Sequence, residues 1–515
     1  MAWASWRSAL SEKSSGIDRI VAGAHDAPAI SAPDRTTLTH GGLRRQIDEA
    51  ARQLNALGIG RGDRVAIVLP NGPEMATAFL SVAATATTAP LNPAYRAEEL
   101  QFYLSDIGAK AILVGEDEAG PAVTVAEQLG IGILRLIADH QAPAGSFRIS
   151  GAPVGEPAAQ GLAEADDIAL LLHTSGTTSR PKLVPLRHAN LAASARNIGA
   201  TLKLSEADRC LNIMPLFHIH GLMAAVLSSL AAGGSVYCTP GFNALRFFQW
   251  LSDARPSWYT AVPTMHQAIL ARAERNSEAV ADAALRFIRS SSASLPPQVM
   301  AELEATFRCP VIESYGMTEA AHQMTSNRLP PGARKAGSVG VASGPEVAIM
   351  AADGRLLPAG EIGEVVIRGE NVTAGYENNL QANESAFAHG WFHTGDQGRM
   401  DADGYLRVTG RLKEIINRGG EKISPLEVDE ALMDHPAVAQ VVTFAMPHDK
   451  LGEDVAAAIV LREGISATEV EIRDFAAGKL ADFKVPRRVV ILDEIPKGAT
   501  GKLQRIGLAA KLGLG

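Results

Sequence analysis

The chain has 515 residues, a formal net charge of −8, 46% hydrophobic residues and 20% charged residues. A chain of this length exceeds one hydrophobic core, so it predicts at least two domains. The negative balance leaves no basic footprint for nucleic acid, and no apolar run approaches the length of a membrane span. We therefore expect neither nucleic-acid nor membrane partners.

The cysteine content and the ends of the chain favour a cytoplasmic protein. Cys210, Cys238 and Cys309 lie far apart, which fits buried thiols in a reducing compartment better than a disulfide framework or a metal site. The first residues lack the apolar core of a signal peptide, and the final Gly-Leu-Gly is not a peroxisomal signal.

The pattern of elements predicts an α/β fold with two unequal domains. From about residue 63 to 330, short β-branched runs alternate with helical segments, which is typical of parallel sheets covered on both faces. Residues 337–410 alternate around Asp-Gly turns and predict hairpins in a small β-barrel or distorted sheet. We expect an N-terminal domain of residues 1–412, with two parallel-rich sheets and this barrel, and a smaller, mobile α+β domain of residues 413–515.

The run HTSGTTSRPKLVPL (His173–Leu186) follows the apolar strand-like run Ile168–Leu172. Its hydroxyls, its backbone amides near a glycine and its lysine suit a polyphosphate, although a solvated turn is the alternative for TSGTT alone. It is not a Walker A loop, because no Gly-Lys-Ser/Thr closes it. The candidate phosphate-binding residues are Thr174, Ser175, Gly176, Thr177, Thr178 and Lys182.

Two other patterns predict no site. Gly58, Gly60 and Gly62 are followed by a strand rather than a helix, so a dinucleotide fingerprint is not expected. His218 and His220 in PLFHIHG could form a metal pair, but no nearby cysteine or carboxylate completes a ligand set.

Five motifs in order resemble those of the acyl-adenylate-forming superfamily, which includes acyl-CoA synthetases, adenylation domains and luciferases. They are HTSGTTSRPKLVPL, ESYGMTEAAH, HTGD, GRLKEIINRGGEKISPLEVD and PKGATGK, and the resemblance runs from about residue 20 onward. It implies an acid–thiol ligase that uses ATP and Mg²⁺ to form an acyl-adenylate and pyrophosphate. Coenzyme A then displaces AMP to give a thioester.

The resemblance implies nucleotide-binding positions around ESYGMTEAAH. It places Tyr315 beside adenine, Thr318 on the α-phosphate and Glu319 on Mg²⁺, which takes few protein carboxylates and relies on phosphate oxygens. Thr318 and Glu319 are thereby implied to be catalytic. Four more positions are implied to line the nucleotide: Ala293, Glu313, Ser314 and Gly316.

The resemblance also implies roles for the motifs near the domain boundary. Asp396 matches the ribose acceptor, since a carboxylate can accept both hydroxyl protons of a cis-diol, and Arg411 matches a second ribose contact. Lys413 matches the hinge. The loop after it is implied to reach the thiol-binding tunnel, and it contains Arg418, Gly419 and Gly420.

Lys502 matches the catalytic lysine of the family, and His218 matches a family-typical histidine that we also expect to be catalytic. Lys502 would bridge the substrate carboxylate and the α-phosphate, neutralising charge during attack on phosphorus. Because Lys502 and the glycine loop serve different half-reactions, the small domain is expected to rotate about Lys413. The chain departs from the family at Ser179 and Leu183, where glycines are usual.

The candidate acid pocket is polar rather than apolar. Ser291 and Ser292 stand where the family often has glycines, and His220 and His322 add imidazoles that could carry positive charge. A hydroxyl and two imidazoles suit a second carboxylate, although Ser291 could equally bond to the backbone. The strings PLFHIHGL, RSSSASLP and YGMTEAAHQMTSN resemble those of oxalate–CoA ligases of plants and fungi. This resemblance implies oxalate, held by Ser292 and His322 with help from His220.

Several alternatives stay open. A medium-chain fatty acid or a coumarate-like acid is the second choice, and malonate is a third, although no arginine is expected to enter the pocket. Loading of a carrier protein and luciferase-like oxidation are other activities of the superfamily. A non-catalytic nucleotide-binding protein on the same fold is the alternative from a different class, and both a monomer and a homodimer are open.

Overall fold

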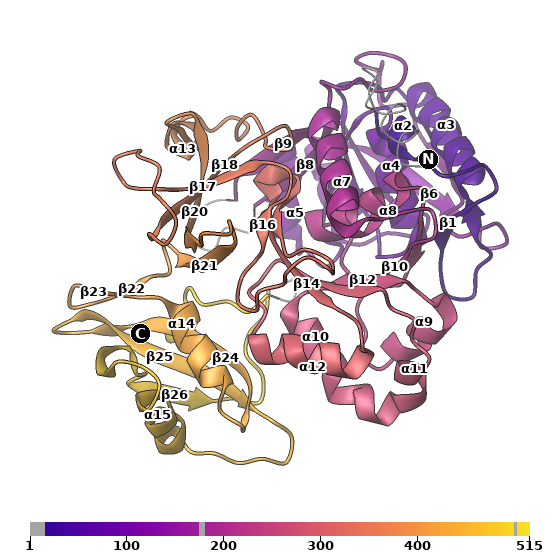
Figure 1. Cartoon of the computed structure of the whole chain (residues 1–515). Helices are drawn as coiled ribbons and strands as arrows, with labels where there is room; N and C mark the ends of the chain where they lie inside the picture. Colours follow the sequence, from indigo (N-terminus) through magenta and orange to yellow (C-terminus); the bar gives the residue numbers. More distant parts are fainter. Residues whose placement is uncertain (1–15, 175–180, 499–501) are drawn as a thin grey trace.

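The structure is a computed structural model that describes residues 16–174, 181–498 and 502–515 (Figure 1). Two sheets form the large part of the molecule. The seven-stranded sheet has the order β7-β6-β5-β3-β4-β8-β9, and the nine-stranded sheet has the order β16-β15-β14-β13-β12-β10-β11-β1-β2. Most neighbouring strands in both sheets are parallel.

The strands of the seven-stranded sheet are β3 (Arg64–Val68), β4 (Thr87–Pro90), β5 (Ala111–Gly115), β6 (Gly132–Ala138), β7 (Phe147–Gly151), β8 (Ile168–His173) and β9 (Leu183–Arg187). Those of the nine-stranded sheet are β1 (Pro28–Ser31), β2 (Leu38–Thr39), β10 (Arg209–Asn212), β11 (Ser235–Cys238), β12 (Trp258–Ala261), β13 (Phe287–Ser290), β14 (Val311–Met317), β15 (His322–Ser326) and β16 (Val341–Ala342).

Helices cover both sheets, so the central strands are buried along their length and read as continuous apolar runs. The helical segments of this part are α2 (Ile17–Ile20), α3 (His40–Ala56), α4 (Pro73–Ala83), α5 (Ala97–Ile107), α6 (Pro121–Leu129), α7 (His188–Leu202), η1 (His220–Leu227), α8 (Ser228–Ala231), α9 (Phe247–Ala254), α10 (Pro263–Ala273), η2 (Glu274–Asn276), α11 (Ser277–Ala281), α12 (Pro297–Phe307) and η3 (Thr318–Ala320). The segment η1 is a π-helix, a form that occurs often at functional sites.

A five-stranded sheet lies between the large part and the C-terminal unit. It consists of β17 (Glu346–Met350), β18 (Gly363–Arg368), β19 (Phe387–Ala388), β20 (Trp391–Met400) and β21 (Leu406–Arg411), with the helix α13 (Leu380–Ala386) beside it. All its pairings are antiparallel. The Asp-Gly turns at Gly354 and Gly404 have positive φ, which a glycine adopts without steric cost.

The C-terminal unit is a mixed sheet with helices. Its elements are β22 (Ile416–Arg418), β23 (Glu421–Ile423), α14 (Pro425–Met433), β24 (Val438–His448), β25 (Gly452–Leu461), α15 (Glu469–Ala477), η4 (Asp482–Lys484), β26 (Arg488–Ile491) and α16 (Leu508–Lys511). Polar contacts join it to the large part, including Arg462 with Glu302 at 3.2 Å and Gln267 with the Ala439 carbonyl at 2.9 Å. The chain passes from one part to the other between β21 and β22, and the expected boundary at residues 412/413 stays a prediction.

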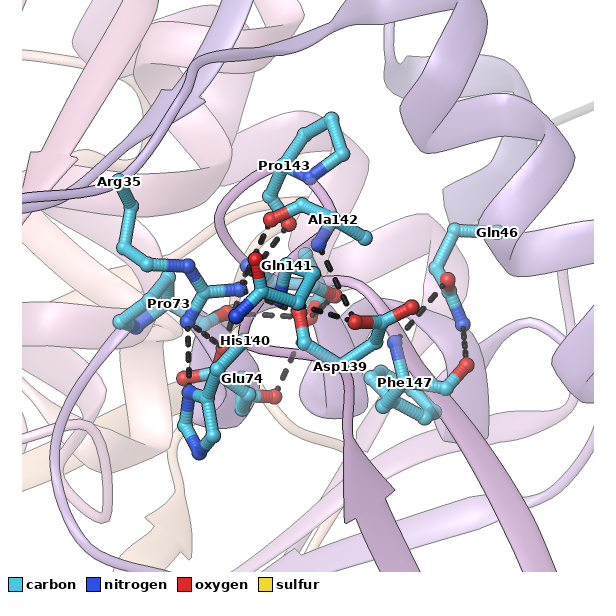
Figure 2. Close-up of polar contacts among 12 residues, drawn as sticks. Arg35, Gln46, Pro73, Glu74, Asp139, His140, Gln141, Ala142, Pro143 and Phe147 are labelled. Atoms are coloured by element: carbon cyan, nitrogen blue, oxygen red, sulfur yellow. Dashed lines mark hydrogen bonds and ion pairs between the residues drawn. The ribbon is translucent and has the colours of Figure 1, made fainter.

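Arg35 fastens the loop between β6 and β7 to the helix α4 (Figure 2). Its guanidinium donates to a Glu74 carboxylate oxygen at 3.1 Å and to the backbone carbonyl groups of Asp139, Ala142 and Pro143 at 2.8–3.3 Å. The Arg35 side chain is only 13% exposed, so these bonds lie largely out of water. One side chain thus closes a loop that has no regular structure of its own.

We expect Arg35→Ala to lower the free energy of unfolding by about 1–3 kcal/mol, because it leaves a partly buried carboxylate and three carbonyl groups without their donor. Denaturant unfolding measures this loss. Arg52→Ala is the control, since Arg52 pairs with Glu49 on an exposed helix face and its removal should change nothing measurable. Equal effects of the two substitutions would contradict the role of Arg35.

Candidate functional site

The predicted site residues gather where β8, β13 and β14 end. The carboxyl ends of parallel strands share one edge of a sheet, and ligands of such folds bind there. β14 runs directly into η3, which carries Thr318 and Glu319, and then turns into β15 at His322. β20 and the segment around Lys502 contribute from the other two parts of the molecule.

Two hydrogen bonds close the base of the predicted phosphate loop. The Lys182 N–H donates to Thr174 Oγ1 at 3.1 Å, and the Thr174 N–H donates to the Lys182 carbonyl at 2.9 Å. The predicted residues Ser175, Gly176, Thr177 and Thr178 lie outside the described residues. Leu183, which replaces a family glycine, is buried in a core cluster and adds no bulk beside the lysine head group.

Glu319 sits beside Lys182 in a buried polar group that also includes Tyr376. The Tyr376 hydroxyl donates to Glu319 Oε1 at 2.8 Å, and the Lys182 ammonium lies 4.4 Å from the centroid of the Tyr376 ring. Burial raises the pKa of Glu319, whereas burial lowers the pKa of Lys182. Tyr376 lies 57 residues from Glu319, and no local pattern marks it in the sequence.

Glu319 fits the expected magnesium ligand. Mg²⁺ in nucleotide sites takes one or two carboxylates and completes its shell with phosphate oxygens and water. Across the described ranges, no group of three or more His, Cys, Asp or Glu side chains could hold a metal ion. A single carboxylate beside the phosphate loop therefore suits a cation that arrives with its nucleotide.

The segment from Glu313 to Gly316 combines buried side chains with a backbone that packs closely against His322. Glu313 Oε1 accepts from the Leu295 N–H at 2.9 Å, and burial raises the pKa of this carboxyl to about 8. The Ser314 side chain is also buried. A Cβ on Gly316 would lie 1.5 Å from the His322 carbonyl oxygen, so only glycine fits there. The nucleotide-binding role expected for Glu313 and Ser314 stays a prediction.

Asp396 is held by two neighbours in a geometry suited to a diol. The Arg411 Nε–H donates to Asp396 Oδ1 at 3.0 Å, and the Tyr315 hydroxyl donates to Asp396 Oδ2. Burial, followed by the nearby Asp396 charge, raises the pKa of Tyr315, so the phenol stays protonated. The fold brings together three predicted nucleotide-binding residues from two different sheets. They are Tyr315 of β14, Asp396 of β20 and Arg411 of β21.

Lys502 reaches this group from the C-terminal unit. Burial and then the Arg411 charge lower the pKa of Lys502 to about 8, while Asp396 and Glu319 act in the opposite direction. Burial and then the Lys502 charge lower the pKa of His218 to about 3. The structure therefore brings the two predicted catalytic residues, Lys502 and His218, into one electrostatic environment with Glu319.

The predicted acid pocket forms one connected group. His220 lies 3.0 Å from the Ser292 hydroxyl through Nδ1 and 2.6 Å from Thr260 Oγ1 through Nε2. The rings of His220 and His322 stack at 4.9 Å, and His322 Nε2 is buried with no hydrogen-bond partner among the described residues. The Ser291 hydroxyl instead donates to the Ser314 carbonyl at 3.0 Å. This is the hydrogen bond to the backbone that the sequence leaves open for Ser291.

The sequence indicates that the imidazoles of His220 and His322 could carry positive charge, and the structure differs. Burial lowers the pKa of both His220 and His322 well below the ordinary value, so the imidazoles are neutral. No arginine obviously enters the pocket from the sequence, but the structure places the Arg289 guanidinium beside this group, 3.4 Å from His220 Nε2. In the sequence, Arg289 directly precedes the serine run Ser290–Ser292, and this adjacency was the only local sign that Arg289 lies near the pocket. Its proximity depends on the pairing of β12 and β13.

Backbone strain is concentrated at the same pocket. Ser292 has φ of +74° and His322 has φ of +97°, and Ala321 beside it has φ of +47°. Side-chain-bearing residues rarely adopt these values, and strained positions persist where the surrounding contacts enforce them, often at functional sites.

The predicted coenzyme A residues lie apart from this group. In Figure 1 the β22–β23 hairpin points away from the large part of the molecule. Arg418 Nε–H donates to the buried Asp454 carboxylate at 2.7 Å, and Gly419 and Gly420 have positive φ between the two strands. Lys413, the predicted hinge residue, is exposed but lies close enough to Lys182 for its charge to contribute, after burial, to lowering the pKa of that lysine. Within the described residues, the structure thus brings Lys502, Glu319 and Asp396 together and leaves the β22–β23 hairpin apart from them.

Comparisons with known proteins agree with this architecture. The AMP-binding enzyme family matches residues 17–377, and the AMP-binding enzyme C-terminal domain matches residues 427–502. The chain is 48% identical to an oxalate–CoA ligase of Arabidopsis thaliana, over 93% of this chain and 94% of the relative. It is 42% identical to an oxalate–CoA ligase of Saccharomyces cerevisiae, over 86% of each.

Among solved structures, ATP-bound MatB from Rhodopseudomonas palustris aligns with a TM-score of 0.86 at 28% identity, over 97% of this chain and 99% of that one. The predicted fold class is thereby confirmed. Within the described residues, no helix has the length and apolar character needed to cross a bilayer.

Proposed function

The chain belongs to the AMP-binding enzyme family, and we propose that it is an ATP-dependent acid–coenzyme A ligase whose acid is oxalate. In the first half-reaction, a carboxylate oxygen of the acid attacks the α-phosphorus of ATP, and pyrophosphate leaves. In the second, the coenzyme A thiol attacks the acyl carbon, and AMP leaves with the bonding electrons. The grouping of Lys502, Glu319, Lys182 and His218 carries the ligase assignment.

In this proposal the protein aligns the reactants and stabilises charge, and no covalent enzyme intermediate is required. Lys502 neutralises charge between the attacking carboxylate and the α-phosphate, and Lys182 binds the terminal phosphates. Asp396 accepts from the ribose hydroxyls. Glu319 would hold Mg²⁺, which would offset the charge of the phosphate oxygens, and the Tyr376 hydroxyl orients that carboxylate.

The polar pocket around His220 and His322 supports oxalate as the acid. His220 Nδ1 lies 3.0 Å from the Ser292 hydroxyl, and His220 Nε2 lies 2.6 Å from Thr260 Oγ1 and 3.4 Å from the Arg289 guanidinium. A hydroxyl both donates and accepts, so Ser292 can contact a ligand carboxylate as well as His220. The unpartnered Nε2 of His322 likewise calls for a polar ligand, because a buried polar atom without a partner is costly.

An acid panel tests the proposal, with pyrophosphate release as the readout in the presence of ATP and coenzyme A. We expect oxalate to exceed octanoate and coumarate in kcat/KM by at least about 10²-fold, because an apolar acid leaves the pocket's buried donors unpaired. Malonate should lie between them. Turnover of octanoate or coumarate well above that of oxalate would contradict the assignment.

A non-catalytic nucleotide-binding protein remains the alternative from another class. Binding alone needs neither the lysine at residue 502 nor the buried Glu319, whereas adenylation uses both. Acid-dependent exchange of pyrophosphate into ATP distinguishes the two functions. Exchange with any acid of the panel favours the ligase, and its absence with all of them favours the binding protein.

The charge of Lys502 predicts the pH dependence of adenylation. Its folded-state pKa is lowered to about 8, and the protonated form is the active one, so charge is lost as the pH rises through 8. We expect kcat/KM for ATP–pyrophosphate exchange to fall on the alkaline side with an apparent pKa near 8. Lys502→Arg should remove this limb, because arginine stays charged. The same limb in that variant would contradict the assignment.

Cellular location and assembly belong to the proposal as well. Cys210, Cys238 and Cys309 are buried free thiols, which fits the cytoplasm, where thiols stay reduced. A monomer and a homodimer are both compatible with the site as proposed, because all of its residues come from one chain.

A further inference from the structure

Arg289 is a fully buried cation with only neutral partners. Its side chain has 0% exposure, and its guanidinium donates to Thr260 Oγ1 at 3.4 Å, His220 Nε2 at 3.4 Å and Gln323 Oε1 at 3.3 Å. Its Nε–H has no partner, and no ion pair found among the described residues includes it. Burial lowers the pKa of Arg289 to about 9, so the group still carries its charge at neutral pH.

An uncompensated buried charge is costly, and proteins normally pair it. Arg505 of the C-terminal unit shows the usual solution, since its guanidinium contacts the carboxylates of Asp429 and Glu414. A neutral side chain at residue 289 could satisfy the same hydroxyl and amide partners without this penalty. The absence of an acidic partner among the described residues therefore points to an anion supplied from outside the chain.

The neighbours of Arg289 lead directly to the acid pocket. The Arg289 guanidinium contacts His220 Nε2 and Thr260 Oγ1 at 3.4 Å, and Thr260 Oγ1 lies 2.6 Å from the same His220 Nε2. His220 Nδ1 lies 3.0 Å from the Ser292 hydroxyl, and His322 stacks on His220. Both imidazoles are neutral, so Arg289 provides the positive charge within this group, while the Lys502 ammonium acts on it from the C-terminal unit. One additional carboxylate in the pocket would neutralise it.

We propose that Arg289 is a positioning and specificity-determining residue whose charge, acting through His220 and Ser292, selects acids with a second carboxylate over monocarboxylic acids. This inference rests on the proposed ligase function and deepens it. The reacting carboxylate is common to all acids of the family, so Arg289 acts on the distal group alone.

The test compares oxalate with oxamate, in which an uncharged amide replaces the distal carboxylate at nearly the same size. Arg289→Met removes the charge and keeps the side-chain length, and Arg289→Lys keeps the charge. We expect Arg289→Met to lower the oxalate/oxamate ratio of kcat/KM by about 10- to 1,000-fold, mainly through KM for oxalate. Arg289→Lys should restore most of the ratio.

Controls separate this inference from loss of the fold and from failure of the proposed function. Thermal unfolding and AMP binding report whether each variant is folded, and Arg289→Gln, which retains hydrogen bonding, replaces Arg289→Met if the latter does not fold. An unchanged ratio in the folded neutral variant overturns the inference while leaving the ligase intact. If wild-type protein uses malonate rather than oxalate, the oxalate assignment fails, and malonate with malonamate gives the same test of Arg289.

Discussion

Lys502→Ala should lower the rate of adenylate formation by about 10²- to 10³-fold, because it removes the cation that neutralises charge at the α-phosphate. Transfer of a pre-formed oxalyl-adenylate to coenzyme A should fall less than about threefold. The reason is geometric: Lys502 approaches Asp396, Glu319 and His218 in this structure, whereas the Arg418 loop lies outside. Single-turnover measurements of the two half-reactions give both numbers.

Lys497→Ala is the matched control for Lys502→Ala. Lys497 lies on the same C-terminal segment and pairs with Glu494 at 2.9 Å, so its removal should leave both half-reactions unchanged. Equal losses in the two half-reactions of Lys502→Ala would contradict an alternating role for the small domain.

The proposed alternation requires contacts between the two parts to break. The Arg462–Glu302 pair is partly exposed, and Gln267 holds the Ala439 carbonyl by one neutral hydrogen bond. Such contacts cost little to exchange for water. Residues near Lys413 are exposed and could absorb the rotation. The thiol loop would then replace Lys502 at the site.

His322→Ala should lower kcat/KM for oxalate by about 10²-fold or more, while ATP affinity stays within about threefold. The substitution removes a buried imidazole whose Nε2 has no protein partner among the described residues and whose ring stacks on His220. A neutral donor aimed at a distal carboxylate is worth most where water is excluded. Steady-state kinetics with varied oxalate, alongside AMP binding, measure both effects.

His266→Ala provides the matched control for His322→Ala. His266 is another fully buried imidazole with an unpartnered Nε2, but its side-chain contact is with Tyr259, and it meets Arg289 only through the Arg289 backbone. Both substitutions should lower stability by creating a cavity. Only His322→Ala should change the preference among acids, and unchanged oxalate kinetics in that variant would remove His322 from the proposed binding set.

The amino-acid sequence by itself determined the family, the fold class and the positions of the motif residues. Parallel strands covered on both faces must be apolar throughout, so β3 and β5 were recognisable as strands from their sequence alone. Phosphate loops require small and hydroxylic residues at fixed spacing, which makes HTSGTTSRPK readable without coordinates. These properties are local, and a linear pattern records them.

Only the tertiary structure decided which groups carry charge and which partners orient them. Tyr376 contacts Glu319 across 57 residues, and Arg289 contacts His220 across 69, so neither pairing leaves a local pattern. The imidazoles of His220 and His322 are neutral because the fold removes them from water and places a guanidinium nearby. A pKa depends on burial and on every neighbouring charge, and both are set when distant strands meet. The proposed preference for acids with a second carboxylate therefore depends on contacts that form only when the chain folds.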